Sequence, residues 1–198
     1  MFRWILLLVF LANISISAYF RWKARQAGET IGRAEEGALL VILRLVFTLP
    51  LFLAILAYVI NPAWMAWSSV AAPVWVRWLG AVLGLGIVPF TYWVFRTIGR
   101  NISETVLTKQ AHELVTDGPY RWVRHPLYTV GTLLLVSVSL LTANWFIGGM
   151  TVLAITMIIL VVIPREEANL IETFGDAYRA YQKKAGRLLP RLWASGSG

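Results

Sequence analysis

Two short polar stretches border long apolar segments of the sequence, and both hold side chains suited to binding a charged ligand. The first, residues 118–128, reads GPYRWVRHPLY and contains Arg121, Arg124 and His125. Its opening Gly-Pro pair predicts a turn, and the proline after the histidine suits the first position of a helix. The basic side chains would then meet at a helix N-terminus, where backbone N–H groups and the helix dipole also favour an anion.

The second stretch, residues 164–190, begins PREEANL and continues with apolar side chains at spacings of three and four. These are Leu170, Ile171, Phe174, Tyr178 and Tyr181. The spacing predicts an amphipathic helix lying against the cytoplasmic face of a membrane. Glu166 and Glu167 fall in its first turn, and because neighbouring helical residues point about 100° apart, one of them should face inward. Glu167 shares its face with the apolar side chains and is predicted to be that residue.

Each stretch alone also fits a role without a ligand. Arginine and tyrosine anchor many membrane helices to lipid headgroups, and glutamates in a first helical turn stabilise the helix dipole by about 0.3–1 kcal/mol. Together, the basic, acidic and aromatic side chains favour a binding site at a membrane boundary. The sequence has no cysteine, which excludes a disulfide framework, a thiolate nucleophile and a cysteine-bound metal. No metal site is predicted.

The apolar segments beside these stretches identify a membrane protein. Hydrophobic residues make up 58% of the 198 residues and charged residues 14%, against about 45–50% and 25% in soluble domains. Five segments approach the roughly 20 residues that cross a ~30 Å hydrocarbon layer: 4–20, 38–60, 74–94, 127–141 and 145–163. The predicted fold class is all-α, a polytopic membrane helix bundle with about five transmembrane helices plus a C-terminal amphipathic helix.

Local patterns refine this bundle. Asn144 separates the last two segments and predicts a tight helical hairpin, while residues 61–73 predict an interfacial loop. Gly80, Gly84 and Gly86 lie inside an apolar segment with no strand before them, so they indicate close helix packing and not a nucleotide-binding loop. A cleaved signal peptide is the alternative for the first segment, because Arg3 precedes it.

The distribution of charge predicts the orientation. Fifteen of the 18 lysines and arginines, and all ten acids, follow the first, third and fifth apolar segments. By the positive-inside rule, the N-terminus lies outside and the C-terminus is cytoplasmic, in the plasma (inner) membrane. This topology and anionic lipid account for the net charge of +8, which therefore gives no support for a nucleic-acid partner.

The motifs ELVTDGPYRWVRHPLY, EEANL, FGDAYRAY and RLLP follow one another within residues 97–190, with an apolar hairpin after the first. Their order resembles the integral-membrane methyltransferases that include isoprenylcysteine carboxyl methyltransferases and phosphatidylethanolamine N-methyltransferases. The resemblance implies a cytoplasm-facing pocket for S-adenosyl-L-methionine. It also implies transmembrane helices one to three in residues 1–96, a methyltransferase-like region in 97–193 and a flexible tail in 194–198. His112, just before the first motif, is predicted to be a surface residue.

The site residues that the resemblance implies serve different parts of that cofactor. Arg124 and His125 would hold its carboxylate, and Glu166 or Glu167 its ammonium or sulfonium side. Glu167, His125 and Arg124 are the predicted catalytic groups, and Glu167 or His125 would take the proton from an amine acceptor. The remaining predicted cofactor contacts are Leu114, Val115, Gly118, Tyr120 and Tyr128.

The resemblance leaves the methyl acceptor open. In the eukaryotic carboxyl methyltransferases an arginine is expected five positions before the second glutamate, where this sequence has Val162, and Arg165 is the nearby candidate to replace it. The predicted acceptor is a membrane lipid or a prenylated small molecule, methylated on a prenylcysteine-type carboxylate or a lipid amine. The alternatives are an NADPH-dependent sterol-type membrane reductase and a non-enzymatic membrane protein.

Overall fold

The computed structural model describes residues 1–26, 38–99 and 114–191, and over these ranges the chain is all-α apart from isolated β-bridges. The helices are α1 (Phe2–Gln26), α2 (Ala38–Ile60), η2 (Pro62–Ser68), α3 (Val74–Ile98), η4 (Gly118–Arg121), α4 (Pro126–Thr142), α5 (Trp145–Met157), η5 (Ile158–Val162), α6 (Ile163–Phe174) and α7 (Asp176–Lys184). The predicted fold class is confirmed. The predicted tail, residues 194–198, and His112 lie outside the described residues.

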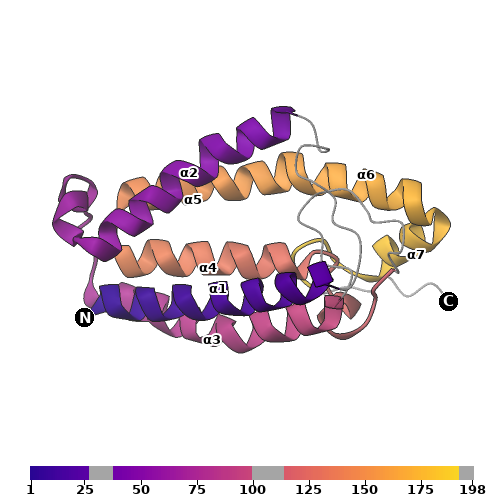
Figure 1. Cartoon of the computed structure of the whole chain (residues 1–198), viewed down its shortest axis with the longest axis horizontal. Coiled ribbons are helices and arrows are strands. Elements are labelled where there is room, and N and C mark those ends of the chain that lie inside the picture. The colour runs from indigo at the N-terminus through magenta and orange to yellow at the C-terminus, as the bar shows by residue number, and fades with distance from the viewer. Residues whose placement is uncertain (27–37, 100–113, 192–198) are drawn as a thin grey trace.

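The bundle has two layers. Figure 1 shows α1, α3 and α4 side by side in one layer, and α2 and α5 in the other. Helix α4 also packs on α5 and so joins the layers. The N-terminus, η2 and the α4–α5 turn lie at one end of the bundle, and η4, α6 and α7 lie at the other (Figure 1). The two polar stretches of the sequence therefore meet at the same end.

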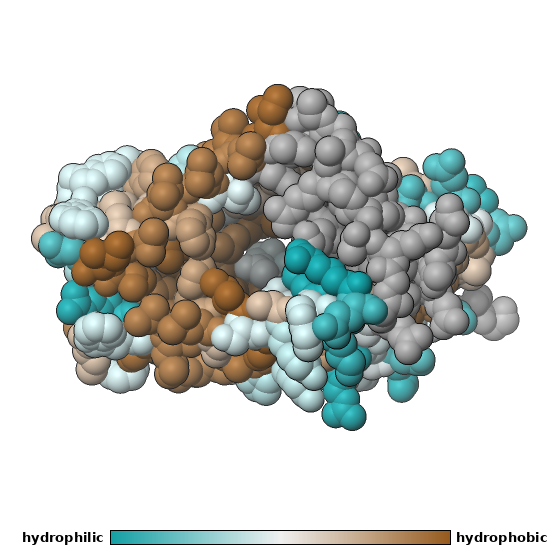
Figure 2. Space-filling model, viewed as in Figure 1, coloured by the Kyte–Doolittle hydropathy of each residue, from teal (hydrophilic) through white to brown (hydrophobic). Residues whose placement is uncertain are grey.

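Within the described ranges, three helices are long and apolar enough to cross a membrane: Phe2–Gln26, Val74–Ile98 and the continuous helix Trp145–Phe174. Leu45–Ile60 and Pro126–Thr142 are shorter apolar helices. Large apolar side chains are exposed along the bundle, as the brown surface in Figure 2 shows. Because an apolar surface of this extent is favourable only against lipid, the chain is an integral membrane protein.

The α4–α5 hairpin has its predicted break at Asn144. The Asn144 side chain accepts a hydrogen bond from the Ile147 N–H at 3.1 Å and so caps α5. Its Nδ2 donates to Met65 O at 3.1 Å and to Ser68 Oγ at 2.8 Å, both in η2. One buried amide therefore fixes the hairpin turn and the loop that packs on it.

The C-terminal amphipathic segment differs from the prediction in how it is connected. No new helix begins at Pro164, since α5, η5 and α6 form one continuous helix, Trp145–Phe174. In the π-type turn before the proline, the Ile163 N–H donates to Ile158 O. This wider turn accommodates a residue that has no N–H to donate and whose ring crowds the preceding carbonyl. The segment then breaks at Gly175, whose φ of 55° suits glycine, and continues as α7.

The close packing of α3 on α4 depends on glycine. A Cβ atom on Gly80 would lie 2.8 Å from Leu141 N and 2.9 Å from Ser137 O. One on Gly84 would lie 2.5 Å from Ser137 Oγ, whereas one on Gly86 would meet nothing within 4 Å. The Ser137 hydroxyl donates to Gly80 O at 2.7 Å across this contact. The predicted role in helix packing is therefore confirmed for two of the three glycines.

We expect Gly80→Ala to lower the stability of the bundle by about 1–3 kcal/mol, because the added methyl group meets backbone atoms that cannot move aside. Gly86→Ala is the matched control, since it makes the same change in the same helix but in open space, and it should be neutral or slightly stabilising. Thermal unfolding in detergent, followed by circular dichroism, compares the two. Equal midpoints would contradict the α3–α4 contact.

Candidate active site

The loop before α4 is paired through its backbone with the segment after α7. The Arg124 N–H donates to Gly186 O at 2.8 Å, and the Gly186 N–H donates to Trp122 O at 2.9 Å. The His125 N–H donates to Arg187 O at 3.1 Å. His125 itself is the N-cap of α4, so this pairing places the C-terminal segment beside the start of that helix.

The carboxylate of Glu167 lies at the centre of the polar cluster, with only 7% of its side chain exposed. Its Oε1 accepts from Arg124 Nε at 3.0 Å and Nη2 at 2.9 Å, and lies 3.2 Å from His125 Nε2. Its Oε2 accepts from Arg187 Nη2 at 2.9 Å. A charge can be buried in this way because each oxygen has a cationic partner. The predicted inward orientation of Glu167 is confirmed.

Arg124 is committed to partners inside the protein. Besides its two bonds to Glu167, its Nη1 donates to Gln182 O at 3.1 Å and to Ala185 O. Its side chain is 9% exposed. The guanidinium therefore joins the loop before α4 to α6 and to the end of α7, and few of its five N–H groups are left for a ligand. The predicted bond from Arg124 to a cofactor carboxylate stays a prediction.

His125 lies between the two glutamates. Its Nδ1 is 3.7 Å from Glu166 Oε1, and its Nε2 is 3.2 Å from Glu167 Oε1. The imidazole is almost fully buried, whereas 27% of the Glu166 side chain is exposed. With its proton on Nε2 the ring donates to Glu167 Oε1, while Nδ1 faces the Glu166 carboxylate beyond hydrogen-bond distance.

Three buried tyrosines lie beside this cluster, in η4 and α7. The Tyr181 hydroxyl donates to Tyr120 O at 2.5 Å. The hydroxyls of Tyr120 and Tyr178 are buried and have no hydrogen-bond partner among the described residues. Burial raises the pKa of both phenols, and a nearby negative charge raises each pKa further: Glu166 for Tyr120, and chiefly Glu167 for Tyr178. Both hydroxyls thus remain protonated donors that a polar ligand of the cluster would satisfy.

The other predicted contacts lie on different sides of the cluster. The ring of Tyr128 is centred 5.8 Å from that of His125. Leu114 packs on the tyrosines of α7, whereas Val115 packs on α3 and α4. Gly118 begins η4 with a φ of 54°, and a Cβ atom there would lie 2.8 Å from a side chain of α3. Tyr128 and Leu114 therefore border the cluster, while Val115 and Gly118 shape the loop that carries it.

Two parts of the cluster are missing from the residues predicted as sites. Arg187 lies 20 residues after Glu167, and their contact depends on the reversal of the chain at Gly175, for which residue spacing gives no signal. Its only signal is the RLLP motif, which Arg187 opens. Tyr178 is expected on an apolar face, and that expectation says nothing about its hydroxyl, which is buried among charged groups.

The model of the isoprenylcysteine carboxyl methyltransferase family matches residues 80–172. A protein-S-isoprenylcysteine O-methyltransferase of Schizosaccharomyces pombe is 34% identical over 96 residues, which cover 48% of this chain and 41% of that protein. A methanethiol S-methyltransferase of Pseudomonas deceptionensis is 40% identical over 79 residues, or 37% and 27% of the two chains. A solved structure of the eukaryotic intramembrane Ras methyltransferase, isoprenylcysteine carboxyl methyltransferase, superposes with a TM-score of 0.56 at 21% identity, covering 95% of this chain and 68% of that one.

These comparisons confirm the resemblance that the motifs indicated. The matched part of the chain spans 41% and 27% of the length of these two curated relatives. The solved structure, at its low identity, shows that the fold is shared. The stretch matched by the family model runs from α3 to α6 and contains Arg124, His125 and Glu167, whereas Arg187 lies beyond it.

We expect Glu167→Gln to lower the free energy of unfolding by about 2–3 kcal/mol, because the neutral amide leaves the Arg124 guanidinium without its counter-charge. Glu166→Gln, the same change at the next residue, should cost under about 1 kcal/mol, since its side chain is partly exposed. Equilibrium unfolding in mixed detergent micelles measures both variants. Equal losses would remove Glu167 from the centre of the cluster.

Proposed function

We propose that the chain is an S-adenosyl-L-methionine-dependent membrane methyltransferase that acts on a lipophilic acceptor. One observation carries the proposal: the buried cluster of Arg124, His125 and Glu167 joins the loop before α4 to α6 within the stretch that the family model matches. Relatives that align with part of this chain are named for methyl transfer to an isoprenylcysteine and to methanethiol. Relatives with different acceptors are what a shared methyl-donor site would produce.

The charges and buried hydroxyls of the cluster fit this cofactor. Glu166 and Glu167 would face its ammonium and sulfonium cations, and the hydroxyls of Tyr120 and Tyr178 would donate to its polar atoms. When bound, S-adenosyl-L-methionine supplies an electrophilic methyl group: the bond from the methyl carbon to sulfur breaks, its electron pair stays on sulfur, and a lone pair of the acceptor forms the new bond. Leu114 and Tyr128 border the cluster with apolar surface suited to the adenosine.

The work left to the chain is positioning and the exclusion of water. Arg124 holds the Glu167 carboxylate in one orientation, and that carboxylate in turn would hold the positive part of the cofactor. A carboxylate acceptor needs no general base. An amine or thiol acceptor must lose a proton, and we assign that proton to His125, which lies between two carboxylates.

The acceptor would approach the cluster along apolar surface. Val162, at the position where the resemblance leads to an arginine, is buried beside Met157 and packs with Phe47 and Tyr128, while Arg165 is exposed. In Figure 2 the described surface over α2 and the neighbouring part of the bundle is largely brown, the colour of hydrophobic residues. Such surfaces favour a membrane lipid or a prenylated small molecule that enters from the bilayer.

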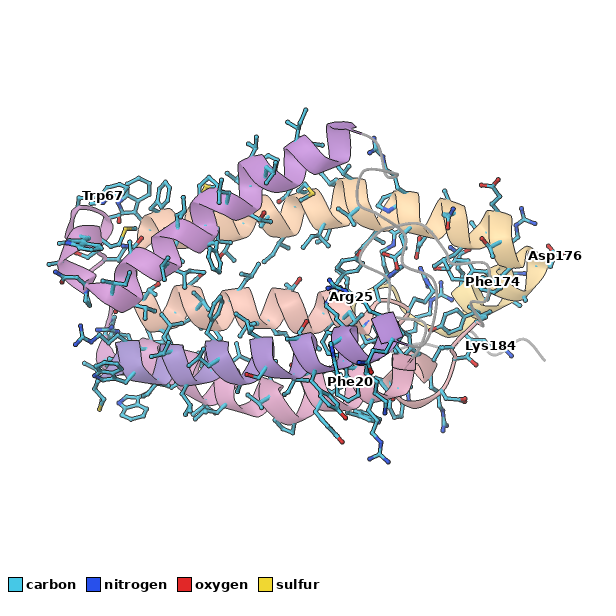
Figure 3. All side chains as sticks on the ribbon, viewed as in Figure 1. Phe20, Arg25, Trp67, Phe174, Asp176 and Lys184 are labelled. Carbon is cyan, nitrogen blue, oxygen red and sulfur yellow. The ribbon has the colours of Figure 1, made fainter. Side chains whose placement is uncertain are left out.

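The polar end of the bundle is proposed to face the cytoplasm. Indole rings lie near both ends, as is usual at membrane interfaces: Trp93 is 5.9 Å from Trp122 near the cluster, and Trp67 is 5.4 Å from Trp145 at the far end. Figure 3 places Trp67 and Phe174 at opposite ends. The basic residues that follow the first, third and fifth apolar segments support this orientation over its reverse. A reporter fused to the C-terminus should be active only in the cytoplasm, and activity only outside would overturn the assignment.

The function is tested by calorimetric titration of the detergent-purified protein with S-adenosyl-L-methionine, S-adenosylhomocysteine and NADPH. We expect saturable binding of the first two ligands and none of NADPH. Binding of NADPH alone would favour a reductase, and binding of none of the three would indicate a protein without this chemistry. A labelled methyl group transferred from the cofactor into a lipid extract would then identify the acceptor.

A further inference from the structure

Among the described residues, Arg187 is the cation of the polar cluster whose guanidinium has N–H groups without a hydrogen-bond partner. Its side chain is 45% exposed and makes one side-chain contact, from Nη2 to Oε2 of Glu167 at 2.9 Å. The other N–H groups of its guanidinium have no described partner. An arginine with a free edge of this kind can bind a carboxylate through two parallel hydrogen bonds.

The backbone around Arg187 is fixed although its side chain is exposed. Its carbonyl accepts from the His125 N–H at 3.1 Å, and the next carbonyl, Leu188 O, accepts from Thr129 Oγ1 at 2.7 Å. Both donors belong to the first turn of α4 or its cap. Only side-chain torsions must therefore change for the guanidinium to leave Glu167 and remain beside the cluster.

We propose that the ion pair of Glu167 and Arg187 is the docking site for the α-amino-acid end of the cofactor, an inference that rests on the proposed function. The ammonium of the ligand would replace Arg187 on Oε2 of Glu167. The released guanidinium would bind the carboxylate of the ligand. Each of the four charges keeps one opposite charge as its partner, so the zwitterion enters without leaving a charge unpaired.

The two oxygens of Glu167 explain why this exchange involves Arg187. Oε1 remains held by Arg124 and lies beside His125, so the carboxylate keeps its orientation when Oε2 changes partner. Release of Arg124 would instead strand the carbonyls of Gln182 and Ala185. The Arg187 side chain is 45% exposed, so water can solvate its guanidinium as it leaves Oε2, and the ammonium of the ligand takes its place beside the buried carboxylate.

The test compares two ligands that differ in one carboxylate: S-adenosylhomocysteine and its decarboxylated amine. Their dissociation constants are measured by calorimetry for the parent protein, Arg187→Ala, Arg187→Lys and Arg179→Ala. The last variant removes an exposed arginine of α7 that forms an ion pair with Asp176, and so controls for the loss of one positive charge from the C-terminal segment. Thermal unfolding of each variant confirms that it is folded.

Arg187→Ala should raise the dissociation constant of S-adenosylhomocysteine by at least about tenfold, which is the effect of one lost charge-assisted contact. The affinity for the decarboxylated amine should stay the same or increase, because the Arg187 guanidinium no longer competes with the ammonium of the ligand for Oε2 of Glu167. Arg187→Lys should restore part of the difference, and Arg179→Ala should change neither ligand.

Equal weakening of both ligands by Arg187→Ala would overturn the inference and make Arg187 a support for Glu167 alone. Unchanged affinity for both ligands would also overturn the inference, and Arg124 and His125 would then be the proposed partners of the cofactor carboxylate. Absence of S-adenosylhomocysteine binding by the parent protein would instead refute the proposed function, and the inference with it.

Discussion

The arrangement of the C-terminal half of the chain depends on the hydrogen bonds that the buried Glu167 carboxylate accepts. A buried negative charge must have cationic or N–H partners, and here these come from the loop before α4 and from the segment after α7. Three segments far apart in the sequence are thereby held at one point. Glu167 is the one carboxylate that both Arg124 and Arg187 contact among the described residues.

The rest of the bundle packs around the two helices that meet at this charge. Gly80 and Gly84 bring α3 against α4, and Asn144 fixes the turn from α4 to α5 at the opposite end. His125 lies at the start of α4, and Glu167 lies in the continuation of α5. The position of the polar cluster is therefore set by apolar packing along the whole thickness of the bilayer.

Most of this arrangement can be predicted from the sequence, because the patterns that indicate each helix lie within that helix or at its ends. Hydropathy predicts a helix over residues 38–60, which is α2, and Pro126 predicts the start of α4 to the residue. Helical periodicity predicts that Glu167 faces inward. The continuity of α5 and α6 could not be predicted, since a proline normally indicates a boundary and only the π-type turn before it makes the helix continuous.

Long-range contacts account for what else was missed. Arg187 meets Glu167 because Gly175 reverses the chain, and a glycine does not specify the direction in which the chain returns. The orientation of Glu167 is confirmed by its burial, and the roles of the site residues stay predictions that the binding experiments test.

The continuous helix from α5 to α6 couples the polar cluster to the thickness of the bilayer. Glu167 lies 22 residues beyond Trp145, or about 33 Å along the axis at the rise of an α-helix. A rigid tilt of about 5°, such as a thinner membrane would impose, moves its carboxylate sideways by about 3 Å. Its partners on the start of α4 and after α7 belong to other elements and do not share that movement. A change in lipid composition that tilts this helix would therefore lengthen or shorten the hydrogen bonds of the cluster.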